Sequence, residues 1–588
     1  MIRRGGIYKV LPNSNKLYDI CFPDSIASSD AESYIRWQGS VIATKSTLFL
    51  CKGSSVATDT YHNLLAVKKI RKYTFYKDFE FRVVGEGNCQ IDLIAMGKGE
   101  NYIYEHVISS QSFFGSFLAS LKFNDIENQY DTLYLRISTY EDTTISNIGI
   151  FSNPITVTNE VSIAYCICSY NHENYISSFV KNIASQFLQD PNIFFYITIN
   201  GEPYSLSFSE NFNVLKNRNL GAAGGFTKSI ITALNSKHHS HIILADDDIL
   251  VNKTSIYKTI ALLKGLKPEY SDYLISSAML SADEKWLQYE RNSSLTKRGF
   301  ILHGANEDTR SKDLAFYTAI APTKLGIAKW RYCCIPVKVM KEYKLPLPIF
   351  GHGHDVEYSI RCAKNILSFN GICAWHKSSI KKYNEVMEDY YLVRNLGIIS
   401  IIYSREFSKL RFYYIFKKFC TNIFLFDYVS ARLNIKALED ILNKEYLSDA
   451  EILHKKIVEY KNQNIDYEEY EGSIFISTQQ KRIPKTKCIF KGILQYFFNI
   501  KRGSVSSFGG DSRNIKSFFG KKRAHIYIGN NLYRLYKFNF KKTWKLMFLF
   551  IKFYIKIVRM DSELQKELIF FRDNFSELSS WENIFKNN

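Results

Sequence analysis

Hydrophobic and polar residues alternate along the first quarter of the chain. Short runs such as 46–50, 79–84 and 132–137 place apolar side chains at every second position, and Gly, Asn, Asp or Ser residues bound them. Alternation with a period of two is typical of strands that are buried on one face. Because no helical periodicity intervenes, the pattern predicts a β-sandwich or jelly-roll domain over residues 1–155.

From about residue 156 to 395, apolar strands alternate with helical stretches. Nearly continuous apolar runs occupy 161–168, 193–199 and 241–245, as expected of parallel strands that are buried on both faces. This alternation predicts a Rossmann-like, doubly wound α/β domain, whose ligands bind beyond the carboxyl ends of the strands. Polar residues directly after these strands are therefore the first candidates for a site.

After residue 395 glycines become rare, and long apolar and basic segments follow. We interpret residues 396–588 as a helical, basic domain. The chain of 588 residues is thus predicted to be a multidomain α/β protein, in which a β-sandwich and a helical domain flank the central α/β domain.

Composition and charge limit the kinds of partner. Hydrophobic residues make up 46% and charged residues 23%, which excludes a disordered or collagen-like chain. The formal net charge is +20, and nearly all of it lies between Lys481 and Arg559, where the only acidic residue is Asp511. We therefore expect an anionic partner: a nucleic acid, an anionic membrane or a phosphorylated substrate.

The sequence offers neither a secretory signal nor a membrane-spanning segment. The residues after Met1 lack an apolar signal core, and no window has the roughly 18 uncharged apolar residues that a spanning helix requires. We expect a soluble or peripheral protein. The 11 cysteines do not form a matched set of CxxC pairs, so we expect reduced, mostly buried thiols in a cytoplasmic protein rather than a cysteine metal site.

Three adjacent aspartates, Asp246, Asp247 and Asp248, follow the apolar run 241–245 at once. Adjacent carboxylates repel, so the cluster is costly unless a cation or N–H donors offset it. Carboxylate oxygens suit Mg²⁺ or Mn²⁺, and such an ion can bridge to a diphosphate and neutralise the charge on a leaving nucleotide. The alternative is a solvated loop with an aspartate helix cap, which the position after a buried strand makes the weaker interpretation.

A glycine-rich segment, Asn219–Phe226, precedes the aspartates. Gly221, Gly224 and Gly225 allow backbone N–H groups to approach an anion closely, and a helix beginning near Gly225 would present its positive end. Arg218 adds a cation. The segment is neither a Walker loop nor a GxGxxG motif, and by itself it is also compatible with a tight turn.

Together, NLGAAGGF at 219–226 and ILADDD at 243–248 resemble the nucleotide-binding half of inverting glycosyltransferases of family 2, which have the GT-A fold. More closely, they resemble the galactofuranosyltransferases that build cell-wall galactan and surface polysaccharides. Those enzymes share the loop and the triple aspartate, and they place a β-rich domain before the catalytic domain and a helical domain after it. The resemblance is specific over about 160–380 and only architectural elsewhere.

The resemblance implies roles for particular residues. The segment Gly351–Arg361 is similar to the one that supplies the catalytic base, and Asp355 takes the base position. Such a carboxylate accepts the proton of the acceptor hydroxyl as it attacks the anomeric carbon. The implied metal ligands are Asp246, Asp248 and His376. The implied contacts to the nucleotide sugar are Asn200, Arg218, Asn219, Gly221, Gly224, Gly225 and Asp247.

Acceptor contacts are implied for Trp330, His354 and Glu357. Trp330 matches one member of a tandem tryptophan pair in the family, whereas the second position is Arg331 here. The family has an aspartate before the base, where this chain has His354. Since a stacking ring and a carboxylate are both replaced, we expect the substrate to differ on the acceptor side.

The segment Lys541–Arg559 is too charged to span a membrane but is strongly amphipathic. On a helix its cations fall within an arc of roughly 100°, and aromatic and aliphatic residues dominate the rest. This distribution predicts a helix that lies on an anionic membrane surface. A helix packed on its own domain remains the alternative, and basic residues among aromatic ones also suit single-stranded nucleic acid.

The combined expectation is an inverting, metal-dependent transfer of galactofuranose from UDP-galactofuranose to a glycan or lipid-linked glycan, with Mn²⁺ or Mg²⁺ as cofactor. We expect a cytoplasmic enzyme, peripheral on the inner face of the cell membrane, for which an oligomer is possible. One alternative is the same reaction with another nucleotide-sugar donor. A second is a nucleic-acid-binding protein, but the acidic cluster has no role in it. A third is an inactive glycan-binding module, which would not need the implied metal ligands. The donor, the linkage and the number of sugars added stay open.

Overall fold

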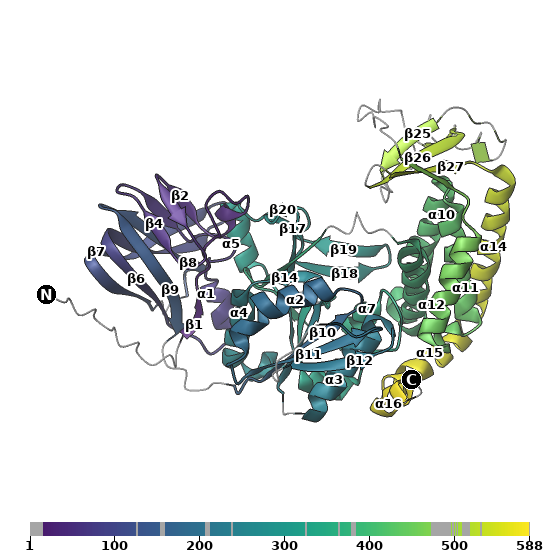
Figure 1. Cartoon of the computed structure of the whole chain (residues 1–588), viewed down its shortest axis with the longest axis horizontal. Coiled ribbons are helices and arrows are strands. Elements are labelled where there is room, and N and C mark those ends of the chain that lie inside the picture. The colour runs from purple at the N-terminus through teal and green to yellow at the C-terminus, as the bar shows by residue number, and fades with distance from the viewer. Residues whose placement is uncertain are drawn as a thin grey trace.

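The computed structural model describes residues 16–124, 128–152, 159–205, 212–236, 239–323, 326–362, 365–377, 384–471, 495–496, 499, 501, 504–508, 518–529 and 532–586. Figure 1 shows three parts in a row. A β-rich N-terminal part (purple) lies at one end, an α/β central part (blue and teal) in the middle, and a largely helical C-terminal part (green and yellow) at the other end.

The N-terminal part is a hydrogen-bonded sheet built around one long strand, β6. The first half of β6 pairs with β9 and its second half with β8, while β7 runs beside it throughout. The predicted strands are present, but whether the folded sheet is a sandwich or jelly roll stays a prediction. The elements are β1 Lys16–Asp19, β2 Arg36–Gln38, β3 Val41–Ala43, β4 Leu48–Leu50, β5 Ser55–Ala57, α1 Val67–Tyr73, β6 Phe79–Lys98, β7 Ile103–Phe123, β8 Thr132–Thr139 and β9 Thr143–Ser152.

The central part contains a sheet in the order β12-β11-β10-β13-β21-β15-β22. The three predicted strands are confirmed as β10 (Ile163–Ser169), β11 (Ile193–Asn200) and β13 (His241–Asp246). They pair in parallel, and nearly all their residues are buried, as continuous apolar runs require. β21 (Tyr332–Pro336) runs antiparallel to β13. The remaining strands of this sheet are β12 Phe212–Asn217, β15 Leu274–Ser276 and β22 Ile366–Leu367.

A smaller sheet has the order β14-β23-β16-β17-β20, and its strand β14 follows the acidic end of β13 in the chain. Its strands β14 (Ile249–Val251) and β23 (Cys373–His376) pair so that Ile249 lies opposite His376. The other strands of the central part are β16 Ala278–Ser281, β17 Leu287–Glu290, β18 Asn292–Thr296, β19 Gly299–His303 and β20 Glu307–Asp308. Its helices are α2 Glu173–Asn182, α3 Gly221–Ser236, α4 Lys253–Gly265, α5 Lys312–Ile320, α6 Val337–Tyr343 and α7 His354–Cys362.

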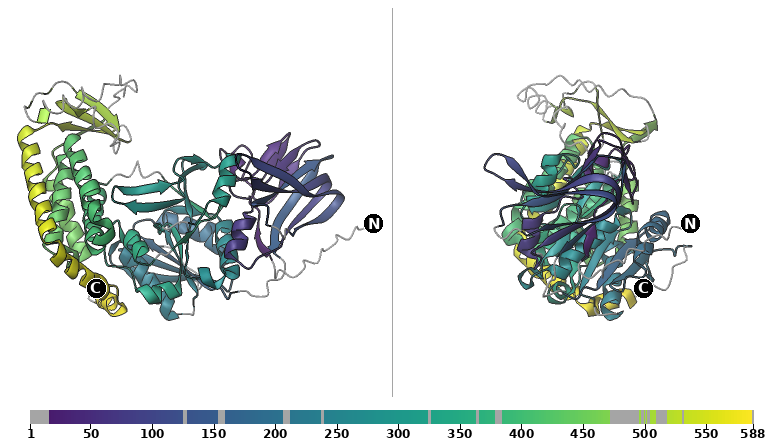
Figure 2. Two further views of the ribbon diagram at one scale, coloured as in Figure 1. Left: turned by 180° about the vertical axis from the view of Figure 1, so that it is seen from behind. Right: turned by 90° about the vertical axis from the view of Figure 1, so that its left-hand side faces the viewer.

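In the C-terminal part the structure differs from the sequence-based interpretation in two respects. The boundary predicted at 395/396 falls inside α8, because Leu392–Ile402 is one continuous helix. The part is also not purely helical, since a sheet in the order β24-β27-β26-β25 stands on the helices (Figure 2). Its elements are α8 Leu392–Ile402, α9 Ser404–Leu410, α10 Lys417–Phe424, α11 Tyr428–Leu442, α12 Ala450–Gln463, β24 Glu468–Glu471, β25 Ser504–Phe508, β26 Arg523–Gly529, β27 Leu532–Lys537, α14 Phe540–Arg559, α15 Asp561–Phe575 and α16 Leu578–Lys586.

The three parts share buried contacts. Ile94 and Met96 of β6 lie in one apolar cluster with Phe316 of α5 and Trp375 of β23. At the other end, α15 and α16 return to the central part, where the Trp581 side chain is buried in the cluster that contains Leu345. No helix within the described ranges is both long and apolar enough to cross a membrane.

Candidate active site

Some of the predicted site residues lie where the central strands end, namely Asn200 at the end of β11 and Asp246, Asp247 and Asp248 at the end of β13. Register aligns Cys168 of β10 with Thr198 of β11 and with Asp246 of β13, so the three carboxyl ends lie at one level of the sheet. In a parallel sheet this edge is where loops collect polar side chains. The candidate site therefore occupies the expected edge.

The glycine-rich segment is helical earlier than predicted. α3 begins at Gly221, so the prediction of a helix start near Gly225 was wrong by one turn. Gly221 has φ of +70°, and Asn219 Oδ1 accepts a hydrogen bond from its N–H at 3.1 Å, which turns the chain into the helix. Gly224 and Gly225 are buried inside α3, and a Cβ on Gly225 would lie 2.2 Å from Cys168 Sγ. Gly225 thus lets the helix pack directly on β10.

Asn200, the last residue of β11, fixes this helix start. Its amide donates to the carbonyl oxygen of Gly221 at 3.0 Å, and its Oδ1 accepts from Asn217 Nδ2 at 2.9 Å. The side chain is buried. Asn200 and Asn219 therefore shape the backbone of the loop, and direct contact of either with a nucleotide stays a prediction.

Arg218 makes a contact that the sequence did not indicate. Its Nη1 lies 2.5 Å from Asp449 Oδ2, and Asp449 caps α12 by accepting from the N–H of Ile452. The cation predicted for the nucleotide thus forms an ion pair that joins the central and C-terminal parts.

Asp247 holds the loop after β10. Its Oδ2 accepts a hydrogen bond from Ser169 Oγ at 2.6 Å, and the His172 ring nitrogen Nδ1 lies 3.0 Å from both carboxylate oxygens. Tyr204 contacts the same loop through the hydroxyl of Ser169. The middle aspartate therefore links two strand ends that a nucleotide in this place would face.

Asp246, Asp248 and His376 are brought together by the pairing of β14 with β23. His376 Nε2 lies 3.2 Å from Asp248 Oδ1. Burial and the neighbouring carboxylate of Asp248 raise the pKa of Asp246 to about 7, although Arg331 acts in the opposite direction. A divalent cation would relieve this repulsion between carboxylates.

The donor set of the three residues fits a divalent ion by its chemistry, since two carboxylates and an imidazole suit Mn²⁺ and Mg²⁺. Among the described residues, however, no group of three His, Cys, Asp or Glu side chains has the arrangement of a metal site. His376 contacts Asp248 directly instead. Metal binding by these residues therefore stays a prediction.

Asp355 lies in the first turn of α7. Its Oδ1 accepts from the N–H of Val356 at 2.9 Å, and its Oδ2 lies 3.9 Å from Lys329 Nζ. Burial acts to raise the pKa of Asp355, but Lys329, His354 and His352 outweigh it, so the pKa lies below its usual value. The residue is thus an ionised carboxylate next to a cation, as a proton acceptor at neutral pH requires.

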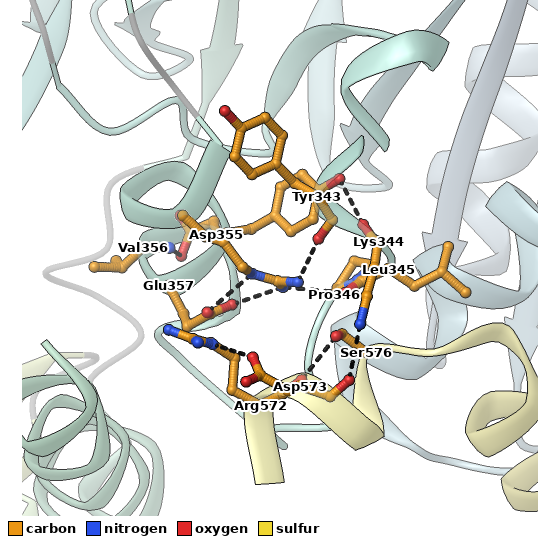
Figure 3. A network of polar contacts seen from close by, with 12 residues as sticks. Tyr343, Lys344, Leu345, Pro346, Asp355, Val356, Glu357, Arg572, Asp573 and Ser576 are labelled. Atoms are coloured by element: carbon orange, nitrogen blue, oxygen red, sulfur yellow. Dashed lines mark hydrogen bonds and ion pairs between the residues drawn. The ribbon is translucent and has the colours of Figure 1, made fainter. Parts of the chain in front are cut away.

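Glu357 is fully buried, and its carboxylate is already engaged. Arg361 donates to it from Nε at 3.1 Å and from Nη2 at 3.0 Å, and the Tyr403 hydroxyl donates at 2.9 Å. Figure 3 shows Glu357 as a member of a network of polar contacts. The geometry favours a structural role for Glu357, and the acceptor contact predicted for it stays untested.

Trp330 and His354 pack against each other, with ring centroids 4.9 Å apart. Phe226 and Tyr358 also contact the indole, which is buried. His354 Nδ1 lies 2.9 Å from the carbonyl oxygen of Gly351, and burial lowers the pKa of His354. The pair therefore builds the wall beside Asp355, while its contact with an acceptor stays a prediction.

Sequence reasoning missed the roles of Lys329 and Arg331. Lys329 faces Asp355, and Arg331 lies close enough to Asp246 to lower its pKa and contacts Glu290 at 3.3 Å. One three-residue segment thus places a cation beside the candidate base and another beside the acidic cluster. The available signal was two cations flanking Trp330 just before β21.

The curated proteins that match the sequence belong to one class of enzyme. No protein-family model matches the sequence. The chain is 25% identical over 240 residues to galactofuranosyltransferase GlfT2 of Mycolicibacterium smegmatis, which covers 38% of this chain and 36% of that protein. It is 23% identical over 199 residues to GlfT2 of Mycobacterium tuberculosis, covering 32% and 31%. The chain therefore matches about a third of the length of these curated relatives.

Among solved structures, S. aureus TarS 1-349 in complex with UDP is 11% identical, with a TM-score of 0.30, over 53% of this chain and 95% of that one. The mannosyltransferase PcManGT of Pyrobaculum calidifontis, in complex with GDP-Man and Mn²⁺, is 11% identical, with a TM-score of 0.27, over 53% and 86%. The sequence relatives confirm the resemblance to galactofuranosyltransferases that the glycine-rich loop and triple aspartate predicted. The chain is a multidomain α/β protein that resembles glycosyltransferases.

Proposed function

We propose that the protein is an inverting glycosyltransferase with a GT-A catalytic domain, which transfers galactofuranose from UDP-galactofuranose to a glycan or lipid-linked glycan. The observation that supports the proposal most directly is the presence of an ionised carboxylate, Asp355, and a separate acidic cluster at Asp246 and Asp248 on either side of the segment 329–331. Lys329 of this segment lies 3.9 Å from Asp355, and Arg331 lowers the pKa of Asp246 through its charge. One carboxylate can then take a proton while the other group handles the leaving nucleotide. The sequence relatives support the choice of sugar.

Asp246, Asp248 and His376 would hold Mn²⁺ or Mg²⁺, which supplies positive charge to the diphosphate of the leaving nucleotide. Asn219 and the start of α3 would face the same diphosphate, because the first N–H groups of a helix lack partners within it. Asn200 and Asp247 hold the strand ends around this place. Arg218 keeps its predicted nucleotide contact only if it leaves Asp449.

Asp355 accepts the proton of the acceptor hydroxyl, and Lys329 keeps it ionised beforehand. Trp330 and His354 form the adjoining wall on the acceptor side. Glu357 ties α7 to Tyr403, and its partner Arg361 ties the same helix to the carbonyl oxygens of Tyr343 and Leu345, which orients Asp355. Inversion follows if the hydroxyl attacks opposite the nucleotide.

We place the enzyme in the cytoplasm, peripheral on the inner face of the cell membrane, where a lipid-linked acceptor is accessible. A different nucleotide-sugar donor is the second candidate, because the relatives that suggest galactofuranose are only 25% and 23% identical to the chain. Nucleic-acid binding is not proposed, since it gives the acidic cluster no role.

The test incubates the full chain with a panel of nucleotide sugars and Mn²⁺, and follows the released nucleotide and the anomeric configuration of the product by NMR. We expect release of UDP from UDP-galactofuranose, loss of turnover with EDTA, and rates about 10² to 10⁴ lower for Asp355→Asn. The control, Asp24→Asn, changes an exposed aspartate of the N-terminal part and should keep full activity. Full activity of the Asp355 variant, or activity unaffected by EDTA, contradicts the proposal.

A further inference from the structure

Helix α14 has one face in the protein core. It lies on the outer side of the C-terminal part, away from the central part, in Figure 1 and in the left view of Figure 2. Leu546, Phe550 and Ile557 are buried, and the Phe550 ring stacks on Phe419 with centroids 4.0 Å apart. Packing on the C-terminal part, the alternative from the sequence, is therefore correct for this face.

The opposite face carries exposed apolar side chains. Phe548 is 70% exposed, and the others are exposed by between 38% and 51%. At 100° per residue, these side chains fall within an arc of about 80°. They are Trp544, Phe548, Ile551, Ile555 and Val558. Five such residues in a row exceed the scattered apolar side chains that an ordinary surface shows.

A row of cations runs directly beside the apolar row, within an adjacent arc of about 60°. None of them forms an ion pair with any residue that the structure describes, whereas Lys542, on another side of the helix, pairs with Asp466. These exposed cations are Lys541, Lys545, Lys552, Lys556 and Arg559. The two rows together are here named the α14 face.

We infer that the α14 face docks on the surface of a bilayer with anionic headgroups. The apolar row enters the interface between headgroups and acyl chains, and the cations contact lipid phosphates, as in helices that lie in the membrane plane. A second copy of the same face would bring like charges together, and a nucleic acid would leave the aliphatic side chains without partners. The inference does not depend on the reaction proposed above.

The first test measures flotation of the full chain with vesicles of phosphatidylcholine, with or without phosphatidylglycerol. We expect binding only to the anionic vesicles, and weaker binding as salt shortens the Debye length. Changing Lys545, Lys552 and Lys556 to Glu should lower the partition coefficient at least about a hundredfold. The fold should persist, because all three side chains are exposed.

A control variant carries the same change of net charge elsewhere. Lys52, Lys77 and Lys122 are exposed lysines of the N-terminal part. Their replacement by Glu should leave vesicle binding within about twofold of the wild type, because these charges are not on the α14 face.

The second test removes the apolar row while keeping the charges. Phe548→Ser, Ile551→Ser and Ile555→Ser together should weaken vesicle binding at every salt concentration, since insertion of apolar groups is not screened. The melting temperature should change little, because these side chains are exposed. The matched control changes three exposed apolar residues of the N-terminal sheet, Val107, Phe114 and Leu118, to Ser.

Several results overturn the inference. The first is a wild-type protein that does not float with phosphatidylglycerol vesicles. The second is equal loss of binding in the control and α14 variants, which would assign the effect to net charge. The third is a protein that self-associates with increasing concentration, or that binds oligonucleotides but not vesicles, if the α14 variants abolish that behaviour. Loss of vesicle binding in both α14 variants, with melting temperature and nucleotide-sugar turnover unchanged, supports it.

Discussion

At the scale of single residues, the environment of Asp355 decides its protonation. Burial by itself raises the pKa of this carboxyl, because it disfavours the charged form. Lys329 is the largest of the opposing influences, and His354 and His352 add to it. The pKa of Asp355 is therefore held down by neighbours that can be removed one at a time.

We predict that Lys329→Met raises the pKa of Asp355. A carboxylate acts as base only above its pKa, so the acidic limb of the pH profile of kcat/KM should move to higher pH. Lys329→Arg keeps the charge and should keep the limb in place. Both profiles are obtained from initial rates across the acidic range, and an unmoved limb in the Met variant would show that Lys329 does not act through Asp355.

Gly225 provides a second residue-scale prediction. A methyl group there would lie 2.2 Å from Cys168 Sγ, far inside van der Waals contact. Gly225→Ala should therefore lower the free energy of unfolding by about 1 to 3 kcal/mol, as overpacked cores do. Cys168→Ala, combined with it, should restore part of the loss. Thermal unfolding of the two single variants and the double variant measures the coupling, and strictly additive effects contradict the proposed contact.

At the scale of elements, the sequence predicted what depends on local pattern. Continuous apolar runs located β10, β11 and β13 because burial on both faces leaves no polar position in the strand. The start of α3 was misplaced because glycines suggest a loop, whereas here they permit close packing on β10. β24, of sequence EEYE, has no strand pattern, since its order comes from pairing with β27.

Two aspartates that cap helices have pKa values that tertiary contacts shift in opposite directions. Asp427 caps α11 and Asp449 caps α12, each by accepting a backbone hydrogen bond. Burial, together with nearby Asp389, raises the pKa of Asp427 to about 7. The pKa of Asp449 is instead lowered, because the backbone N–H of Ile452 and Arg218 outweigh its partial burial.

Opposite pH dependences follow for the two caps. Asp427 ionises at lower pH in the unfolded chain than in the folded protein. Its contribution to the free energy of unfolding is therefore lost as the pH rises from about 4 to 7. Asp427→Asn should thus stabilise the protein at pH values above about 7 and have little effect near pH 4. Asp449→Asn should destabilise it above about pH 4. Urea unfolding at acidic and neutral pH checks both signs, and equal signs would contradict the assignment.

At the scale of the whole molecule, distant segments complete the candidate site. Leu345 donates its N–H to the carbonyl oxygen of Ser576 at 2.9 Å; Figure 3 labels both residues. Arg361 Nη2 donates to the carbonyl oxygen of Leu345 at 3.0 Å. Arg361 in turn holds Glu357, two residues after Asp355. The sequence could not predict this chain of contacts, or the pairing of Arg218 with Asp449, because neither has a local pattern.

We predict that Trp581→Ala destabilises the central part and not only α16. The indole is buried in the cluster around Leu345 and donates from Nε1 to the carbonyl oxygen of Pro346 at 2.8 Å. Its removal should cost about 3 to 5 kcal/mol. Leu578→Ala, at an exposed position of α16, is the control and should change stability by about 0.5 kcal/mol or less. Hydrogen exchange of the Trp581→Ala variant checks the prediction. If the amides of β10 and β13 exchanged at the wild-type rate, the destabilisation would be limited to the C-terminal helices, contrary to the prediction.

The position of Trp581 also bears on how the protein is made. Its partner Pro346 leaves the ribosome 235 residues earlier. At cellular rates of translation, that interval is on the order of ten to fifty seconds. During this time the apolar surface around Leu345 has no cover, and the support behind Asp355 is missing. A nascent chain stalled in the interval would thus hold a nearly complete central sheet with an exposed apolar surface, which is prone to aggregation. Translation speed through the C-terminal part would set how long that state persists.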